Sequence, residues 1–327
     1  MPAEVRLVLV DDEDAGQRLD NFLFRQLKGV PKTHIYRIIR SGEVRVNRGR
    51  ASAERRIEAG DQIRLPPLRT SERADDKAKL MAGGGAAHVL GREFPILYED
   101  DCLIAIDKPA GVAVHGGSGV SFGVIEQLRM ARPQARLLEL VHRLDRETSG
   151  ILLVAKKRSA LKNLQDQFRS RETDKTYLAL VSGLWPTRRK VLDKSLHKYL
   201  LPDGERRVKV VAKDHPDAMP SLTLVKVARA SPSCSLLEVT IKTGRTHQIR
   251  VHLAAEGMPI VGDDKYGDFE LNKTLQGPST PVPLRRMFLH AWRLQFRHPA
   301  SGQSQQLQAD LPSELAQYLD HVLPISS

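Results

Sequence analysis

The first 66 residues alternate between apolar and polar positions in short runs, which predicts a small domain of helices and strands. Leu19, Phe22, Leu23 and Leu27 recur at helical spacing, so a first helix is expected there. Short strand patterns follow around Val44, Val46, Ile63 and Leu65, with Gly60-Asp61 as a turn. This part of the chain is therefore expected to mix helical and β structure.

A second short helix is predicted between Pro31 and Gly42. At about 100° per residue, its apolar and basic positions separate onto opposite sides of the helix. The apolar side carries Ile35, Ile38 and Ile39, and the basic side carries Lys32, Arg37 and Arg40. One face should pack against the domain while the other presents positive charge.

Regular periodicity disappears from residue 67 to residue 92, where the chain is polar and contains three consecutive glycines, Gly83 to Gly85. Such a composition predicts a flexible linker. Beyond it, strand-like runs at Ile96-Leu97 and Leu103–Ile106 begin an alternation of short strands and helices that continues to the end. We expect an α+β protein with domains at 1–66 and 93–327, joined by the linker 67–92.

The chain is strongly basic, with 51 Lys and Arg against 39 Asp and Glu, a formal net charge of +12. This balance favours a polyanionic partner, with nucleic acid as the first candidate and an anionic membrane surface as the alternative. From residue 17 to residue 56 the bias is steeper. Eleven cations (positions 18, 25, 28, 32, 37, 40, 45, 48, 50, 55 and 56) face only Asp20, Glu43 and Glu54. An ordinary solvated surface is the competing interpretation of this run.

No apolar stretch approaches the roughly 18 residues that span a membrane, and the acidic start of the chain is unlike a signal peptide. We therefore expect a cytoplasmic protein. The two cysteines, Cys102 and Cys234, each lie in an apolar run, which is typical of buried thiols in a reducing compartment. Neither a zinc site nor a disulfide framework is predicted.

The segment from residue 140 to residue 157 contains the best candidate for chemistry. Asp145 lies in a polar stretch just before the apolar strand Ile151–Ala155, so a loop at a strand edge should present its carboxylate. Arg143 and Arg146 flank it, and nearby cations favour the ionised form that a nucleophile or general base requires. For a lone Asp, a salt bridge or turn cap is the alternative role.

Residues 17–66, with GQRLDNFL, PKTHIYRIIRSGEVRVN and IEAGD, resemble the small RNA-binding domain first seen in ribosomal protein S-four. The resemblance implies that the basic helix docks on RNA phosphates through Lys32, Arg37 and Arg40. Contacts of this kind position a protein on RNA and seldom select a base.

Four further segments, in order along the chain, resemble one enzyme family. They read LIAIDKPAGVAVHGG (103–117), VHRLDRETSG (141–150), KTYLALV (175–181) and KTGRTHQIRVHL (242–253). Together they are similar to the RNA pseudouridine synthases that act on large-subunit ribosomal RNA and some tRNAs. The resemblance covers about residues 93–300, and it implies a mixed α+β catalytic domain with a central, mostly antiparallel sheet.

Position by position, the resemblance implies a role for four residues. Asp145 matches the essential carboxylate, and Arg143 matches the arginine that replaces the flipped uridine in its stack. Tyr177 matches the aromatic residue that lies against the target base, although a core tyrosine is the plain alternative. Arg250, rather than Arg245, matches the arginine that pairs with the catalytic Asp, and it should lie on a helix from about residue 246 to residue 256.

The implied reaction breaks the N1–C1′ bond of a uridine, turns the base and joins C5 to C1′. It involves no redox change and no transferred group, so neither a cofactor nor a metal is expected. The implied partner is large-subunit ribosomal RNA or one of its assembly intermediates, bound by a monomer. The competing class is a non-catalytic RNA-binding or ribosome-assembly protein that keeps the fold without turnover.

Overall fold

The computed structural model describes residues 5–11, 14–27, 30–67, 91–116, 122–202, 204–278 and 280–324. The chain divides into two compact units, residues 1–90 and residues 91–327. Most of the expected linker, residues 68–90, lies outside the described residues, as does the side chain of Lys32. Among the helices that are described, none combines the length and the apolar character needed to cross a membrane.

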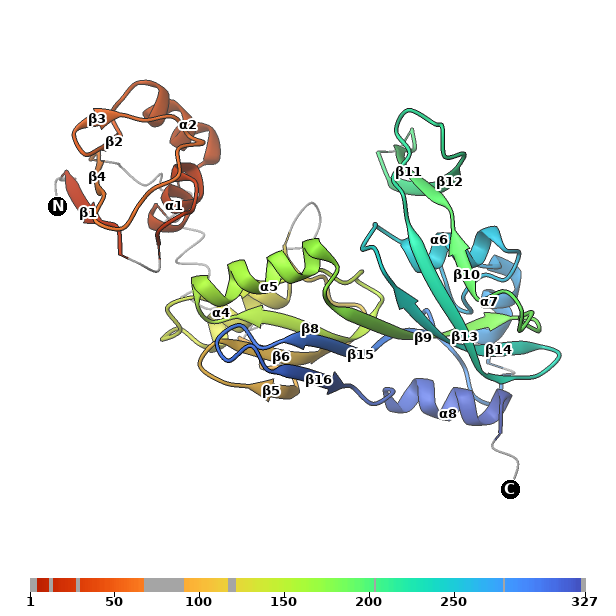
Figure 1. Ribbon diagram of the computed structural model, residues 1–327. Helices are drawn as coiled ribbons and strands as arrows, with labels where there is room; N and C mark the ends of the chain where they lie inside the picture. The colour runs from red at the N-terminus through yellow and green to blue at the C-terminus, as the bar shows by residue number, and fades with distance from the viewer. Residues whose placement is uncertain are drawn as a thin grey trace. The chain divides into compact units, whose positions relative to one another are not determined.

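The N-terminal unit packs two helices against a small antiparallel sheet (Figure 1). Its helices are α1 (Leu19–Gln26) and α2 (Lys32–Arg40), and its strands are β1 (Arg6–Leu9), β2 (Arg45–Val46), β3 (Gly49–Arg50) and β4 (Gln62–Leu65). The strand order is β1-β4-β2-β3. The predicted helices and strands are present, with boundaries within a few residues of those expected.

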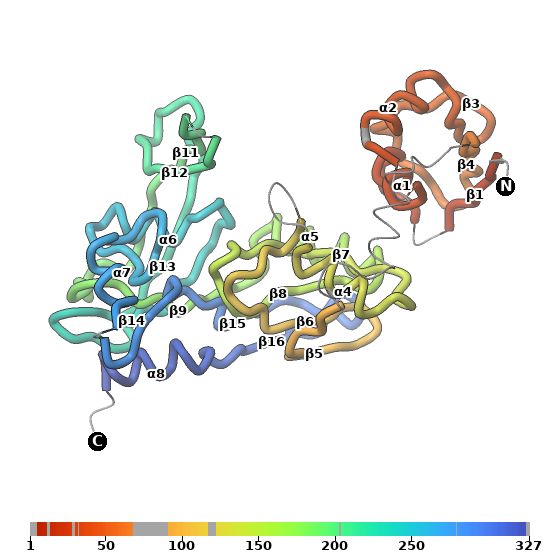
Figure 2. The backbone as a smooth tube through the Cα atoms, turned by 180° about the vertical axis from the view of Figure 1, so that it is seen from behind, coloured from red at the N-terminus to blue at the C-terminus, as the bar shows by residue number. Residues whose placement is uncertain are grey.

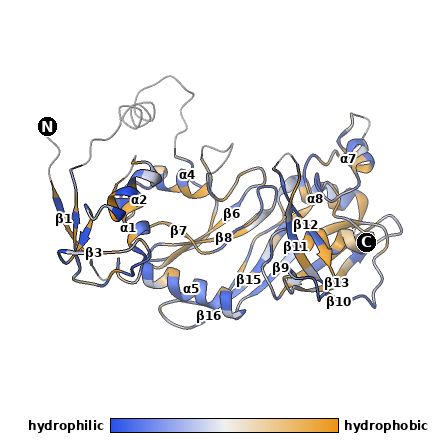
Figure 3. Cartoon of the chain, turned by 90° about the horizontal axis from the view of Figure 1, so that it is seen from above, coloured by the Kyte–Doolittle hydropathy of each residue, from blue (hydrophilic) through white to orange (hydrophobic). Residues whose placement is uncertain are grey.

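Helix α2 has the two-sided character that its sequence predicts. Ile35, Ile38 and Ile39 are buried in the core of the unit, whereas Arg37 and Arg40 are exposed. Figure 3 shows hydrophobic and hydrophilic residues side by side on this helix. Within the described part of the unit, the exposed arginines make local hydrogen bonds, Arg37 with the His34 ring and Arg40 with the Tyr36 carbonyl oxygen.

The second unit is built on one large sheet of ten strands in the order β10-β13-β14-β9-β15-β8-β6-β5, with β16 on β15 and β7 on β8. The strands are β5 (Ile96–Glu99), β6 (Leu103–Lys108), β7 (Glu139–Leu140), β8 (Ser149–Ala155), β9 (Asp174–Ser182), β10 (Val191–Asp193), β13 (Leu222–Ala230), β14 (Cys234–Ile241), β15 (Leu289–Arg297) and β16 (Ser304–Gln308). A separate hairpin joins β11 (Ser195–Leu200) to β12 (Arg206–Val211). Among the described strands, β8 and β15 alone pair in parallel, which confirms the expected α+β fold with a mostly antiparallel sheet.

Helices cover both faces of this sheet (Figures 1 and 2). They are α4 (Val124–Ala131), α5 (Arg158–Ser170), α6 (Gln248–Ala255), α7 (Phe269–Gln276) and α8 (Ser313–Val322). Alternate residues of β8 point to opposite faces, so Leu152 and Val154 pack in the core with α4, while Ile151 and Leu153 pack with α5. Because all seven residues of β8 are buried, the strand is a rigid anchor for the loop that precedes it.

Candidate active site

The loop between β7 and β8 carries Asp145, and hydrogen bonds to the backbone of this loop hold it in place. Lys108 Nζ donates to the carbonyl oxygen of Arg146 at 3.0 Å, and the Gly111 amide donates to the same oxygen at 2.9 Å. Arg286 Nη2 reaches the carbonyl oxygen of Glu147 at 3.4 Å. Two basic side chains thus fix the residues that follow Asp145, which limits the movement of the carboxylate.

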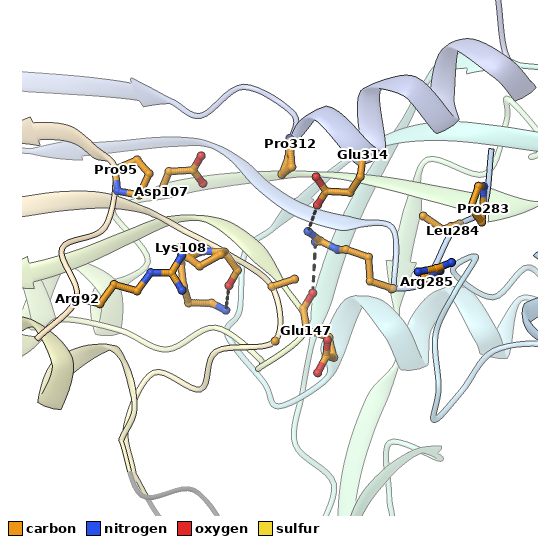
Figure 4. A pocket seen from close by; sticks show the side chains of 14 residues that line it. Arg92, Pro95, Asp107, Lys108, Glu147, Pro283, Leu284, Arg285, Pro312 and Glu314 are labelled. Carbon is orange, nitrogen blue, oxygen red and sulfur yellow. Dashed lines mark hydrogen bonds and ion pairs between the residues drawn. The ribbon is translucent and has the colours of Figure 1, made fainter. Parts of the chain in front are cut away.

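Those basic side chains lie beside a cavity of about 770 Å³, shown in Figure 4 with Lys108, Glu147 and Glu314 around it. Lys108 is fully buried and also donates to the carbonyl oxygens of Pro109 and Val112. Burial, followed by the charge of Arg286, lowers the pKa of Lys108 to about 7. Cations and carboxylates are mixed in the wall of this cavity, and Asp145 does not line it.

Asp145 is paired with a buried arginine from a distant part of the chain. Its Oδ2 atom lies 3.3 Å from Nη1 of Arg250, and its side chain keeps 27% exposure against 4% for Arg250. Arg250 lies in α6, in which every residue from Gln248 to Leu253 is buried. Arg245, the weaker sequence candidate, donates to the Pro220 carbonyl oxygen instead.

Arg250 is itself held by two more carboxylates. Asp263 accepts from Nε at 2.7 Å and from Nη2 at 2.6 Å, and Asp264 accepts from Nη2 at 3.2 Å. Burial alone would lower the pKa of Arg250, but the hydrogen bond and charge of Asp263, with the charges of Asp145 and Asp264, raise it above its ordinary value. The guanidinium therefore remains charged beside Asp145.

Tyr177 from β9 forms a buried wall of the same site. It lines a cavity of about 100 Å³ together with Arg143, Asp145 and Arg250. Burial, then the negative charge of Asp145, raises the pKa of the Tyr177 hydroxyl above its ordinary value, so it stays protonated at neutral pH. The four residues that the sequence marks in the second unit are brought together around this one small cavity.

The two arginines next to Asp145 in sequence do not pair with it, contrary to the expectation that they would hold its charge. Arg146 Nε bonds Glu147, and Arg143 makes no side-chain ion pair with another described residue. A loop sends neighbouring side chains in different directions, so proximity in sequence is a poor guide to ion pairing here. Arg250 supplies the cation instead.

His247 and Tyr266 belong to the site but do not stand out in the sequence. His247 Nε2 lies 4.0 Å from Asp145 Oδ2, and His247 Nδ1 lies 2.8 Å from the Tyr266 hydroxyl. The Tyr266 ring lies 5.2 Å from the Arg250 guanidinium. Burial lowers the pKa of His247 despite the opposing charge of Asp145, which favours a neutral ring at pH 7.

Asp263 was also missed. It follows Gly262 in a loop where no periodicity marks it, and only the acidic pair Asp263-Asp264 in that loop could have drawn attention. Gly262 has φ +79°, and a Cβ there would lie 2.1 Å from the Arg286 carbonyl oxygen, so the tight backbone approach requires glycine. This turn places the Asp263 carboxylate against Arg250.

Comparison with known proteins gives two matching families. The family described as RNA pseudouridylate synthase matches residues 102–255, and the S4 domain matches residues 17–63. Ribosomal large subunit pseudouridine synthase C of Escherichia coli (strain K12) is 49% identical over 317 residues, which are 96% of each protein. The protein with the same name from Haemophilus influenzae is 47% identical over 313 residues, covering 96% of this chain and 94% of that protein.

Two solved structures of RNA pseudouridylate synthase domain proteins are also similar to this chain. Human RNA Pseudouridylate Synthase Domain Containing 4 has 28% identity and a TM-score of 0.57, covering 70% of this chain and 92% of its own. Human RNA Pseudouridylate Synthase Domain Containing 1 has 26% identity and a TM-score of 0.56, with 70% and 87% covered. With relatives this similar over nearly its whole length, and with an S4 domain before the catalytic unit, the chain belongs to the RNA pseudouridylate synthase family.

Proposed function

We propose that this enzyme converts specific uridines of large-subunit ribosomal RNA to pseudouridine in the cavity formed by Asp145, Tyr177 and Arg250. The observation that carries the assignment of Asp145 is its ion pair with the buried Arg250 at the edge of a small cavity. The names of the bacterial relatives support ribosomal RNA of the large subunit as substrate. We propose further that the enzyme works in the cytoplasm, where ribosomal RNA of a bacterium is found, and that it acts as a monomer.

The reaction needs a carboxylate that is ionised and partly shielded from water. The N1–C1′ bond breaks, the uracil turns while still held, C5 bonds to C1′, and the proton on C5 leaves while N1 gains one. Ionised Asp145 can enter in three ways: by attacking C6 of the base, by attacking C1′, or by removing a sugar proton to give a glycal. Arg250 stabilises the charged carboxylate in each route.

The remaining side chains hold the nucleotide. Tyr177, protonated and buried, packs against the uracil or relays the final proton. Arg143 is exposed at the mouth of the cavity, where it takes the space that the extruded uridine leaves in its stack. No redox or group-transfer step occurs, so the reaction itself calls for no cofactor.

The N-terminal unit positions the substrate. Exposed Arg37 and Arg40 on α2, together with Lys32 in the same helix, dock on RNA phosphates and bring the ribosomal RNA to the enzyme. We assign residues 1–66 to this domain, 67–92 to the linker and 93–327 to catalysis.

Carbodiimide mapping tests the assignment. Unmodified large-subunit ribosomal RNA is incubated with purified enzyme, and carbodiimide-dependent reverse-transcription stops are mapped. Wild type and Asp101→Asn, a change in the exposed β5–β6 turn, should give new stops, and Asp145→Asn should give none. Absence of stops with wild type favours the non-catalytic assembly role. The same stops with Asp145→Asn would falsify the assignment of Asp145.

A further inference from the structure

The small Asp145 cavity adjoins two wider ones. Arg143, Gly244 and Arg245 line all three, so the three cavities meet beside the Asp145 site. The flanking volumes are about 440 Å³ on the side of α5 and about 700 Å³ on the side of Asp264. A strand whose middle nucleotide enters the small cavity would send its neighbours into both flanking spaces.

The two flanking cavities differ in charge. The wall of the larger one mixes five cations with the carboxylates of Asp145, Glu147 and Asp264. None of the described residues that line the smaller one is acidic, and six are basic: Arg143, Arg169, Arg171, Lys175, Lys242 and Arg245. A wall of one sign attracts an anion, which here selects the smaller cavity as the place for a phosphate.

Not all six cations are equally available. Lys242 pairs with Asp174 at 2.5 Å, Arg169 pairs with Asp166 at 2.6 Å, and Lys175 is buried. Arg171 is exposed and forms no side-chain hydrogen bond or ion pair with another described residue. Arg171 and Arg143 can therefore donate to a ligand without breaking an existing ion pair or hydrogen bond of their side chains.

The backbone around Arg171 is fixed. The residue ends α5 in the left-handed conformation, with φ +63°, and its amide donates to the Gln167 carbonyl oxygen. The Gln167 side chain is tied to both the amide and the carbonyl of Arg297 in β15. A guanidinium mounted on an anchored helix end loses less freedom on binding than one on a loose loop.

The floor of the cavity is also rigid. The Phe168 ring stacks on His142 with a centroid distance of 4.7 Å and an interplanar angle of 16°, and Lys175 Nζ lies 5.3 Å from the Phe168 centroid. His142 Nε2 accepts from the Leu153 amide of β8 at 3.1 Å. The layer is thereby fastened to the same strand that anchors the Asp145 loop.

We propose that the cavity around Phe168 and Arg171 binds the backbone phosphate of an RNA nucleotide directly next to the extruded uridine, with Arg171 as its main ligand. This rests on the proposed function, because it takes the uridine to enter the Asp145 cavity. It adds a subsite that fixes the strand on the α5 side, separate from the contacts of the N-terminal domain.

Binding measurements in the Asp145→Asn background test this without turnover. The probe is a synthetic RNA segment around a mapped uridine, and its Kd is measured over a range of salt concentrations. Arg171→Gln should raise the Kd several-fold and lower the salt slope by about 0.7 to 1, the value for one lost phosphate contact. Arg171→Lys should keep most of the slope, since the charge remains.

Lys162→Gln is the matched control, because Lys162 is exposed on the same helix but lines none of the three cavities. It should leave both the Kd and the slope near the parent values. Equal effects of Arg171→Gln and Lys162→Gln would mean that only general positive charge matters, and the subsite would be refuted.

A neutral methylphosphonate at each linkage flanking the uridine locates the phosphate. At one of the two linkages, the methylphosphonate should weaken RNA binding by the parent protein and by Lys162→Gln. The same change should weaken RNA binding by Arg171→Gln very little, because that variant has already lost the contact. If the loss is the same with Arg171→Gln at both linkages, Arg171 contacts neither phosphate and the proposal is wrong. Failure of the proposed function would show separately, as missing carbodiimide stops with wild type.

Discussion

The Arg250 guanidinium is divided among three carboxylates that differ in burial. Asp263 is fully buried and holds two of its nitrogens, Asp145 faces the cavity, and Asp264 is largely exposed. A carboxylate that shares its cation with a stronger partner keeps accessible oxygen lone pairs. We therefore regard Asp263 as the residue that positions Arg250, leaving Asp145 available for the substrate.

Asp263→Asn should loosen that arrangement. It removes the charge of a buried pair, so the free energy of unfolding should fall by about 3 kcal/mol. A misplaced Arg250 should lower kcat by about 10²-fold while the Kd for RNA changes little. Single-turnover kinetics measure the loss of rate, RNA binding measures the Kd, and urea unfolding measures the loss of stability. Asp264→Asn, at the same guanidinium but exposed, should cause a smaller loss of rate and of stability. Equal losses from the two variants would contradict the positioning role.

His290 provides a prediction about pH. Arg286 Nη2 donates to Ser149 Oγ at 2.7 Å, Ser149 Oγ lies 2.9 Å from His290 Nδ1, and His290 Nε2 lies 3.1 Å from the Ala309 carbonyl oxygen. In this series of hydrogen bonds, the neutral His290 ring accepts from the Ser149 hydroxyl and donates to the Ala309 carbonyl oxygen. Burial lowers the pKa of His290 from 6.5 to about 4.

The unfolded chain binds a proton at that position below about pH 6.5, whereas folded His290 binds it only near pH 4. The contribution of neutral His290 to the free energy of unfolding is therefore fully present above pH 6.5. It is lost as the pH falls to about 4, by up to about 1.4 kcal/mol per pH unit. Urea unfolding followed by tryptophan fluorescence reports the second unit, because Trp185 and Trp292 both lie there. His290→Gln should flatten this pH dependence, and an unchanged slope would show that His290 is not its source.

At the scale of elements, α2 and α6 show opposite relations between a helix and its surroundings. Helix α2 buries three isoleucines and leaves its arginines in solvent, so a pattern of 3.6 residues describes it well. Helix α6 is buried from Gln248 to Leu253, including Arg250 and His252. Where every face is covered, periodicity no longer indicates which side chain meets which neighbour.

The exposed face of α2 should contribute to RNA affinity through charge alone. Replacing both Arg37 and Arg40 by Gln should lower the salt slope of RNA binding by about 1.4, for two phosphate contacts. Because these side chains do not enter the core, the unfolding transition should be unchanged. Arg6→Gln, an exposed arginine on β1, should change the slope less. A double variant with the parent slope would remove α2 from the RNA interface.

At the scale of the whole molecule, each hydrophobic cluster of the described residues lies within one unit. One cluster fills the N-terminal unit, and the others belong to residues 91–327. A unit that has its own hydrophobic core can in principle fold alone. The catalytic unit should therefore keep its structure when the N-terminal unit is removed.

Deletion of residues 1–66 should leave the tryptophan-detected unfolding midpoint unchanged while the Kd for RNA rises and its salt dependence flattens. Equilibrium urea unfolding and salt-dependent binding provide the two readouts. A shifted midpoint would show that the units stabilise each other. An unchanged salt slope would show that the first unit does not dock on RNA.

The sequence alone determined the features that depend on local pattern. Alternation and helical spacing indicated the α+β class, both helices of the first unit and the strands around Val46, Ile63 and Leu103, because burial of one face repeats with the period of the element. The motifs identified the family and marked Asp145, Arg143, Tyr177 and Arg250. Boundaries shifted by a few residues, as at α6, where helix ends depend on contacts outside the helix.

Tertiary structure alone decided which charges meet. Asp145 and Arg250 are 105 positions apart, and the partners Asp263, His247 and Tyr266 reach them from turns that no periodicity predicts. The same holds for the cationic cavity, whose wall combines the end of α5 with the segment after β14. Local sequence fixes which face of a strand or helix is buried, but only the packing of distant segments sets the distance between two side chains, and electrostatic interaction depends on that distance.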